Sequence, residues 1–126
     1  MSELQSTVPF VIPEANTTHI KRKRFDLAYV PISPAQKLDI YWPAEGHGPF
    51  PVIVSIHGGA FMGGDKRDVQ LVPMLEGLER GYAVVGVNYR MSGEAKFPAL
   101  VHDVKAAIRW IRANAAAYAH PARLAR

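Results

Sequence analysis

The residues best suited to chemistry form one segment, His57-Gly58-Gly59-Ala60-Phe61-Met62-Gly63-Gly64-Asp65. Two adjacent glycines let the backbone turn sharply and approach a ligand closely, because glycine has no Cβ and accepts positive φ angles. Backbone N–H groups turned inward at such a turn can hold a developing oxyanion, and one such donor is worth about 2.7–4 kcal/mol to a transition state. The segment therefore predicts an anion-stabilising loop, and the alternative is a glycine-rich turn without chemistry.

Other combinations of reactive side chains have weaker geometry. Ser55 precedes His57 by two residues, so both side chains share one face of a strand, and we expect that face to be buried rather than to carry a nucleophilic pair. His102 and Asp103 are adjacent, and adjacent helical residues do not face each other. We expect Asp103 to form a structural ion pair with Arg90 instead. The sequence contains no cysteine, and no pair of histidines has the spacing of a metal site, so we expect neither a metal nor another cofactor.

Strand patterns surround the loop. Residues 25–30 and 38–42 alternate between apolar and polar, which predicts two half-buried antiparallel strands. In the first, Phe25, Leu27 and Tyr29 should share one face. Residues 52–56 and 82–87 are nearly continuous apolar runs, typical of parallel strands buried on both faces. The loop begins at the carboxyl end of the third strand, where open α/β sheets bind ligands.

Two helices complete the pattern. The first is expected near residues 69–80, with Asp65 or Asp68 capping its start and Gly81 following its end. The second should open at Pro98 and fade near Tyr118. The expected apolar stripes are Leu71, Leu75 and Leu78 with Val72 beside them in the first helix, and Val101, Val104, Ile108 and Ile111 in the second. The order β-β-β-α-β-α predicts an α/β fold in which antiparallel first strands precede parallel βαβ units in one mixed sheet.

Five motifs in a fixed order resemble those of α/β-hydrolase esterases and lipases. The resemblance covers roughly residues 25–126 and is closest to the hormone-sensitive-lipase-like group and the bacterial carboxylesterases. The motifs are Leu38–Pro43, the loop His57–Phe61, Val87–Arg90, Phe97–Ala99 and Asp103–Ile111. The resemblance implies a partial α/β-hydrolase fold and hydrolysis of a small carboxylic ester.

The same resemblance assigns roles by position. Gly58 makes the turn of the oxyanion-hole loop, Gly59 and Ala60 donate their backbone N–H groups, and His57 braces the loop. The Gly-x-Ser-x-Gly elbow of this fold does not occur among the 126 residues, so the serine, acid and histidine of the triad are expected beyond Arg126. The chain is therefore expected to be an amino-terminal fragment that is inactive alone, and a non-catalytic binding or interaction module of the same fold is the alternative.

Composition and charge bear on nucleic-acid binding, membrane insertion and location. The net charge of +4 includes the run Lys21–Arg24, which we interpret as a solvated stretch before the first strand, because no nucleic-acid motif accompanies it. No segment approaches the ~20 apolar residues of a membrane span, and the start has no signal-peptide pattern, so a cytoplasmic location is expected. We interpret residues 1–24 as an amino-terminal extension and residues 25–126 as the hydrolase portion. Without a neighbouring nucleophile strand, the apolar strand at 52–56 would be an open edge, which predicts self-association.

Overall fold

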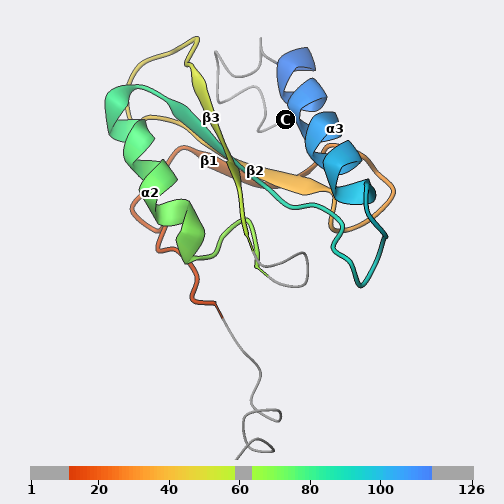
Figure 1. Cartoon of the computed structure of the whole chain (residues 1–126). Helices are drawn as coiled ribbons and strands as arrows, with labels where there is room; N and C mark the ends of the chain where they lie inside the picture. The colour runs from red at the N-terminus through yellow and green to blue at the C-terminus, as the bar shows by residue number, and fades with distance from the viewer. Residues whose placement is uncertain (1–11, 59–63, 115–126) are drawn as a thin grey trace, which may run out of the picture.

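The centre of the fold is a four-stranded sheet with the strand order β1-β2-β4-β3 (Figure 1). The computed structural model describes residues 12–58 and 64–114. The antiparallel strands β1 (Lys23–Ala28) and β2 (Lys37–Tyr41) form one half, and β2 also pairs antiparallel with β4 (Ala83–Val87). Strand β3 (Val52–Ile56) pairs parallel with β4. The expected antiparallel start and the adjacent parallel pair are both confirmed.

Helical segments cover both faces of this sheet. Between β3 and β4 the chain forms η1 (Val69–Leu71), α2 (Val72–Leu75) and η2 (Glu76–Arg80), and α3 (Ala99–Ala113) follows β4. Figure 1 places α2 and α3 on opposite sides of the sheet. The described part of the chain has no helix long and apolar enough to cross a membrane.

The helix expected near residues 69–80 is present but is mostly 3₁₀ in geometry. Pro73 has no N–H to donate to the carbonyl four residues earlier, and the Val72 N–H bonds instead to Val69 O in a tighter turn. Of the two expected caps, Asp68 is the one that accepts a bond from the Gln70 N–H, and Gly81 ends the helical segment at a φ of 85°.

The core is divided into two clusters by the sheet. The larger one joins β2 and β4 to α3, and the smaller one joins the opposite face to η1. Leu38, Ile40 and Trp42 belong to the larger cluster and Tyr41 to the smaller, as their alternation predicts. The expectation that this strand is half-buried is wrong: Asp39 and Tyr41 are as fully buried as the leucine and isoleucine beside them. The strand has a neighbour on each side and packed elements on each face.

The expectation that Phe25 and Leu27 share a face of β1 is also wrong. The pairing register of β1 with β2 shifts between Arg24 and Leu27, and Asp26 adopts a φ of 61°. This bulge sends Phe25 to the smaller cluster and leaves Leu27 against the larger one. A bulge inserts an extra residue, and the period-two pattern cannot reveal it.

Of the two continuous apolar strands, only β4 is buried throughout. In β3 residues 52–54 are half-buried and Ile56 is 49% exposed, because among the described residues β3 pairs on one side only. Strand β3 is thus one edge of the described sheet, and β1 is the other.

Helix α3 ends earlier than expected, and its buried residues coincide with the expected apolar stripe only at Ile111. It ends at Ala113, where Asn114 hydrogen-bonds to Trp110 O through its side-chain amide; Tyr118 lies outside the described residues. The deepest side chains are Asp103, Ala107 and Ile111, whereas Val101, Val104 and Ile108 are half-buried. The buried face of the second helix is thus displaced from the expected apolar stripe. In the first helical segment Val72, expected beside the stripe, is 43% exposed.

The basic run is not simply solvated. Arg22 donates hydrogen bonds to Pro43 O and Gly46 O, each at 2.8 Å, and so ties the loop after β2 to the start of β1. Strand β1 already begins at Lys23, and Ile20 is part of the smaller core cluster. Ile20, Arg22 and the start of β1 therefore pack on the fold rather than lying free in solvent.

Candidate functional site

The candidate site lies at the carboxyl ends of the parallel strands β3 and β4. His57 and Gly58 follow β3, and Asn88–Arg90 follows β4. The chain returns to this edge at residues 64–70, beside the start of the first helical segment. Gly59 and Ala60, which the sequence suggests as oxyanion donors, lie outside the described residues. The geometry given below is therefore that of the residues around them.

His57 is held in a buried stack. Its ring lies on Tyr89 with centroids 4.7 Å apart and planes 15° apart, and the Tyr89 hydroxyl donates to His57 O at 2.7 Å. Burial raises the pKa of Tyr89, which keeps this donor protonated. His57 Nδ1 lies 3.2 Å from Gly58 O, and Nε2 is buried without a hydrogen-bond partner in the part of the chain that the structure describes.

The backbone of Gly58 is paired at both its polar groups with one side chain. Gly58 N–H donates to Gln70 Oε1 at 2.7 Å, and Gln70 Nε2 donates to Gly58 O at 3.0 Å. Gln70 Nε2 also donates to Asp68 Oδ2 at 3.0 Å, and Asp68 is 3% exposed. Because its N–H is already used, Gly58 is not free to donate that N–H to an anion.

Of the glycines at positions 58 and 64, only Gly64 has a φ angle that requires glycine. Gly64 has a φ of 89°, and a Cβ there would lie 2.4 Å from Gly58 O and 2.6 Å from His57 Nδ1. Gly58 does not adopt a positive φ, contrary to the expectation for a turn residue. A Cβ at Gly58 would instead meet Gln70 Oε1 at 3.2 Å. The two residues that flank positions 59–63 are thus in contact with each other.

Asn88 joins the end of β4 to the returning chain. Its side-chain amide donates to Asp65 Oδ1 at 2.9 Å and accepts from the Lys66 N–H at 2.8 Å. Burial opposes ionisation of Asp65, but the hydrogen bonds from Asn88 and from the Arg67 N–H outweigh it and lower the pKa of this carboxyl group.

A buried ion network lies behind this turn. Lys66 Nζ contacts Asp26 Oδ1 at 2.8 Å and Asp39 Oδ1 at 3.3 Å, and Arg67 Nε donates to Asp39 Oδ2 at 2.7 Å. The side chains of Lys66 and Asp39 are 4% and 0% exposed, whereas that of Asp26 is 51% exposed. The hydrogen bond from Lys66 lowers the pKa of Asp26. The network anchors the returning chain to β1 and β2.

Arg90 and Asp103 are brought together as a bidentate pair. Arg90 Nε and Nη2 donate to the two carboxylate oxygens of Asp103 at 3.0 and 2.9 Å, and the Arg90 N–H and the Gln36 amide bond to the same carboxylate. Burial would raise the pKa of Asp103, but the bonds from Arg90 and Gln36 lower it. This pair joins the segment after β4 to α3.

Ser55 is not paired with His57. Ser55 is 8% exposed, and His57 contacts Gly58 O through Nδ1 while Nε2 has no described partner. Among residues 12–58 and 64–114, no group of three or more His, Cys, Asp or Glu side chains could hold a metal ion.

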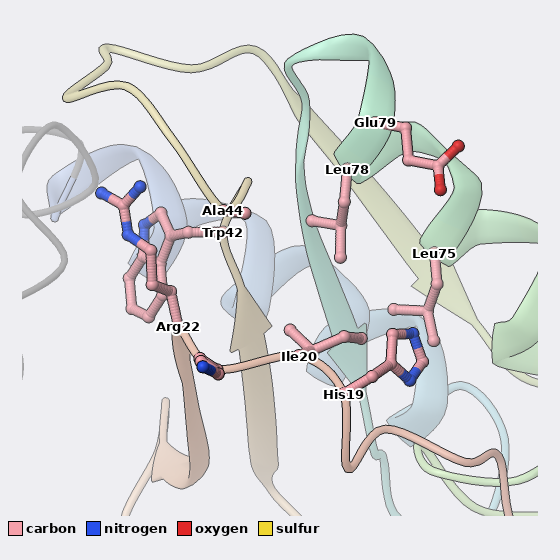
Figure 2. Close-up of a pocket in the computed structure, with 9 residues that line it drawn as sticks. His19, Ile20, Arg22, Trp42, Ala44, Leu75, Leu78 and Glu79 are labelled. Atoms are coloured by element: carbon pink, nitrogen blue, oxygen red, sulfur yellow. The ribbon is translucent and has the colours of Figure 1, made fainter.

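An apolar pocket lies away from this site. Figure 2 shows its walls, formed by the segment before β1, the residues just after β2 and the helical segments before β4. Trp42 follows Tyr41, which pairs with Val84 near the amino end of β4. The pocket is therefore at the amino ends of the parallel strands, opposite the edge where open α/β sheets bind ligands.

The sequence analysis did not predict the contact of Gln70 with Gly58, the bond between Asp68 and the Gln70 side chain, or the ion network. The sequence did contain a signal for the network. Asp39 is a charged residue between two apolar residues of a strand, and Lys66 and Arg67 are two cations directly after the glycine-rich loop. Gln70 carried no such signal, because an exposed glutamine at the start of a helix is ordinary.

Comparisons with known proteins agree with the fold described above. A family model described as BD-FAE matches residues 38–124. Esterase LipQ of Mycobacterium tuberculosis is 35% identical over 96 residues, which are 74% of this chain and 23% of LipQ.

Two solved structures are also similar. A bifunctional GH43-CE protein of Bacteroides eggerthii is 40% identical with a TM-score of 0.68, over 78% of this chain and 14% of that one. A truncated form of a carbohydrate esterase from gut microbiota is 32% identical with a TM-score of 0.68, over 87% of this chain and 39% of that one. The chain spans well under half the length of each of these relatives.

Proposed function

The chain belongs to the BD-FAE family, of the α/β-hydrolase type, and from this premise we propose that residues 57–60 form the oxyanion-hole loop of a carboxylic-ester hydrolase. In this proposal the backbone N–H groups of Gly59 and Ala60 bind the oxyanion. His57 and Gly58 hold the start of the loop. The serine, acid and histidine that complete the reaction are expected beyond residue 126.

The observation that carries the proposal is the contact between Gly58 and Gly64. The chain leaves β3 at His57, and at Gly64, six residues after Gly58, it is again within contact of Gly58 O. A loop closed this tightly at a strand's carboxyl end suits the inward turn of successive N–H groups. The Gly58 N–H is bound to Gln70, which supports assignment of the donors to the next two residues.

The chemistry assigned to the loop is electrostatic. When a serine Oγ adds to the ester carbonyl carbon and its proton passes to a histidine, negative charge develops on the carbonyl oxygen. Donors already in place stabilise that charge without reorganising. The bracing by Tyr89 and Gln70 supplies the rigidity that this role requires.

The test uses a version of the protein extended through the nucleophile. Ala60→Gly should retain kcat for p-nitrophenyl acetate, because the donor is backbone. Ala60→Pro removes the N–H and should lower kcat by about 10²–10³. Circular dichroism and thermal unfolding of both variants check folding. Parent-like turnover by a folded Ala60→Pro variant contradicts the assignment, and an extended parent that binds esters without turnover favours a binding module.

We also propose that the isolated chain associates with a second copy of itself along β3. In this proposal β3 of one copy pairs with β3 of the other, because its outer edge has no described partner. An apolar groove beside this edge supports the proposal. The groove is lined by Pro49, Phe50, Val52, Val54, Ile108, Ile111 and Arg112. Burying this apolar surface would favour association.

A further inference from the structure

The apolar pocket at the amino ends of the parallel strands has the size of a ligand site. Its volume is about 450 Å³, and small-molecule sites in proteins span roughly 300–1,000 Å³. Three separate segments form its walls, namely the chain before β1, the chain just after β2 and the helical segments before β4 (Figure 2). A slender ligand placed between these walls would be contacted from several sides.

The interior of the pocket is mainly aliphatic. Figure 2 shows Leu75 and Leu78 directed from the helical wall toward Ile20. Ile20 is 8% exposed and belongs to the smaller core cluster, on which the two leucines pack as half-buried neighbours. Trp42 and Ala44 line the wall after β2. An apolar chain that enters the pocket removes its own surface and the surface of these walls from water, which favours binding.

The rim of the pocket carries a cation without a partner. Lys21 is exposed, and in the part of the chain that the structure describes no hydrogen bond or ion pair holds its ammonium group. The neighbouring Arg22 differs, because it donates to Pro43 O and Gly46 O. Glu79, which is also exposed and lines the pocket, would repel a ligand with two negative charges. The rim therefore suits a ligand with a single negative charge.

We propose that this pocket is a second ligand site, which binds a medium-chain aliphatic monocarboxylate. The aliphatic chain lies between the helical wall and Ile20, and the carboxylate lies beside Lys21. The site does not depend on the proposed function, because the pocket and the glycine-rich loop are at opposite ends of the parallel strands.

Binding is tested on the 126-residue chain by NMR with ¹³C-methyl-labelled isoleucine and leucine. Decanoate should shift the methyl signals of Ile20, Leu75 and Leu78 in a saturable way, with a Kd below about 1 mM. The signals of Leu38, which is buried in the larger core cluster, should stay unchanged. Ile56, 49% exposed in β3, reports any non-specific binding to exposed apolar surface.

Two analogues separate the contribution of the chain from that of the charge. Hexanoate keeps the carboxylate but has four fewer methylene groups, and it should bind at least about tenfold more weakly because less apolar surface is buried. Decyltrimethylammonium keeps the apolar chain and reverses the charge. Its Kd should be about 3- to 10-fold higher than that of decanoate, since Lys21 then repels the head group.

Substitutions test the residues that carry the proposal. Lys21→Glu should raise the Kd of decanoate about 3- to 10-fold and lower that of decyltrimethylammonium, because it reverses the charge at the rim. Lys105→Glu changes the net charge equally at an exposed position of α3, and this control should keep both parental affinities. Ala44→Trp fills the pocket from an exposed position and should weaken the binding of both ligands at least about tenfold. Parental Leu38 signals show that each variant is folded.

Each outcome decides the proposal. Saturable shifts confined to the pocket and weakened by Lys21→Glu and Ala44→Trp support it. A lack of saturable shifts at about 1 mM decanoate, equal shifts at Ile56, or a parental Kd in Lys21→Glu overturns it. Shifts of the pocket signals that depend on protein concentration without decanoate would show that a second copy of the chain occupies the pocket, and they would overturn it as well.

Discussion

The two carboxylates of the ion network should contribute very unequally to stability, although they bind the same two cations. Asp39 is fully buried, accepts from Arg67 Nε and the Asp26 N–H, and contacts Lys66 Nζ at 3.3 Å. Asp26 binds the same pair of cations, but its side chain is 51% exposed. Asp39→Asn and Asp26→Asn therefore form a matched pair in which the chemistry is the same and only burial differs.

The magnitudes follow from what each substitution leaves behind. Asp39→Asn removes the buried carboxylate beside Lys66, whose side chain is 4% exposed, and removing one partner of a buried pair costs about 3–5 kcal/mol. We expect the lower end, about 3 kcal/mol, because Asp26 still contacts Lys66. Asp26→Asn should cost about 1 kcal/mol or less, since water replaces an exposed partner. Asparagine also tolerates the φ of 61° at this position.

Urea denaturation at neutral pH measures both losses. The free energy of unfolding should be determined at several protein concentrations, because self-association would add to apparent stability. Equal losses for the two variants, or a loss below about 0.5 kcal/mol for Asp39→Asn, would refute the argument that burial of the carboxylate decides its contribution.

Four further outcomes are expected. Gly64→Ala should destabilise the chain by more than the roughly 1–2 kcal/mol of a left-handed non-glycine residue, because its Cβ would also meet Gly58 O at 2.4 Å; urea unfolding measures the loss, and a loss below 1 kcal/mol would contradict it. Because the pKa of Asp103 is lowered in the folded chain, its pairing stabilises the fold above the unfolded-state pKa of about 3.9, and this stabilisation is lost as the pH falls through the folded-state pKa. The difference in unfolding free energy between the parent and Asp103→Asn should therefore narrow on acidification below about pH 4. The isolated chain should scatter light as a dimer or larger species at about 100 μM, and a monomer would exclude pairing along β3. It should not turn over p-nitrophenyl esters above a protein control or be labelled by a serine-directed phosphonate, and labelling at Ser55 would reveal a nucleophile of its own.

Local patterns in the sequence determined the order of the elements and the family. The alternating and continuous apolar runs predicted the four strands of the described sheet, because side-chain direction repeats every two residues along a strand whatever its neighbours are. The His-Gly-Gly motif between a strand and a helix indicated the loop, and its neighbours Val87–Arg90 and Asp103–Ile111 indicated the esterase family. These features depend on residues close together in the chain, which is why one sequence was enough.

The tertiary structure decided which polar groups are buried and what they bind. Asp39, Lys66 and Arg67 meet across 27 to 28 residues, and Gln70 reaches back 12 residues to Gly58. The bulge at Asp26 reverses the face of Phe25 without leaving any mark on the alternating pattern. Local patterns carry no information about such contacts, because a charged or amide side chain is stable in the interior only when a partner from a distant segment satisfies it, and only the folded chain brings that partner within hydrogen-bond distance.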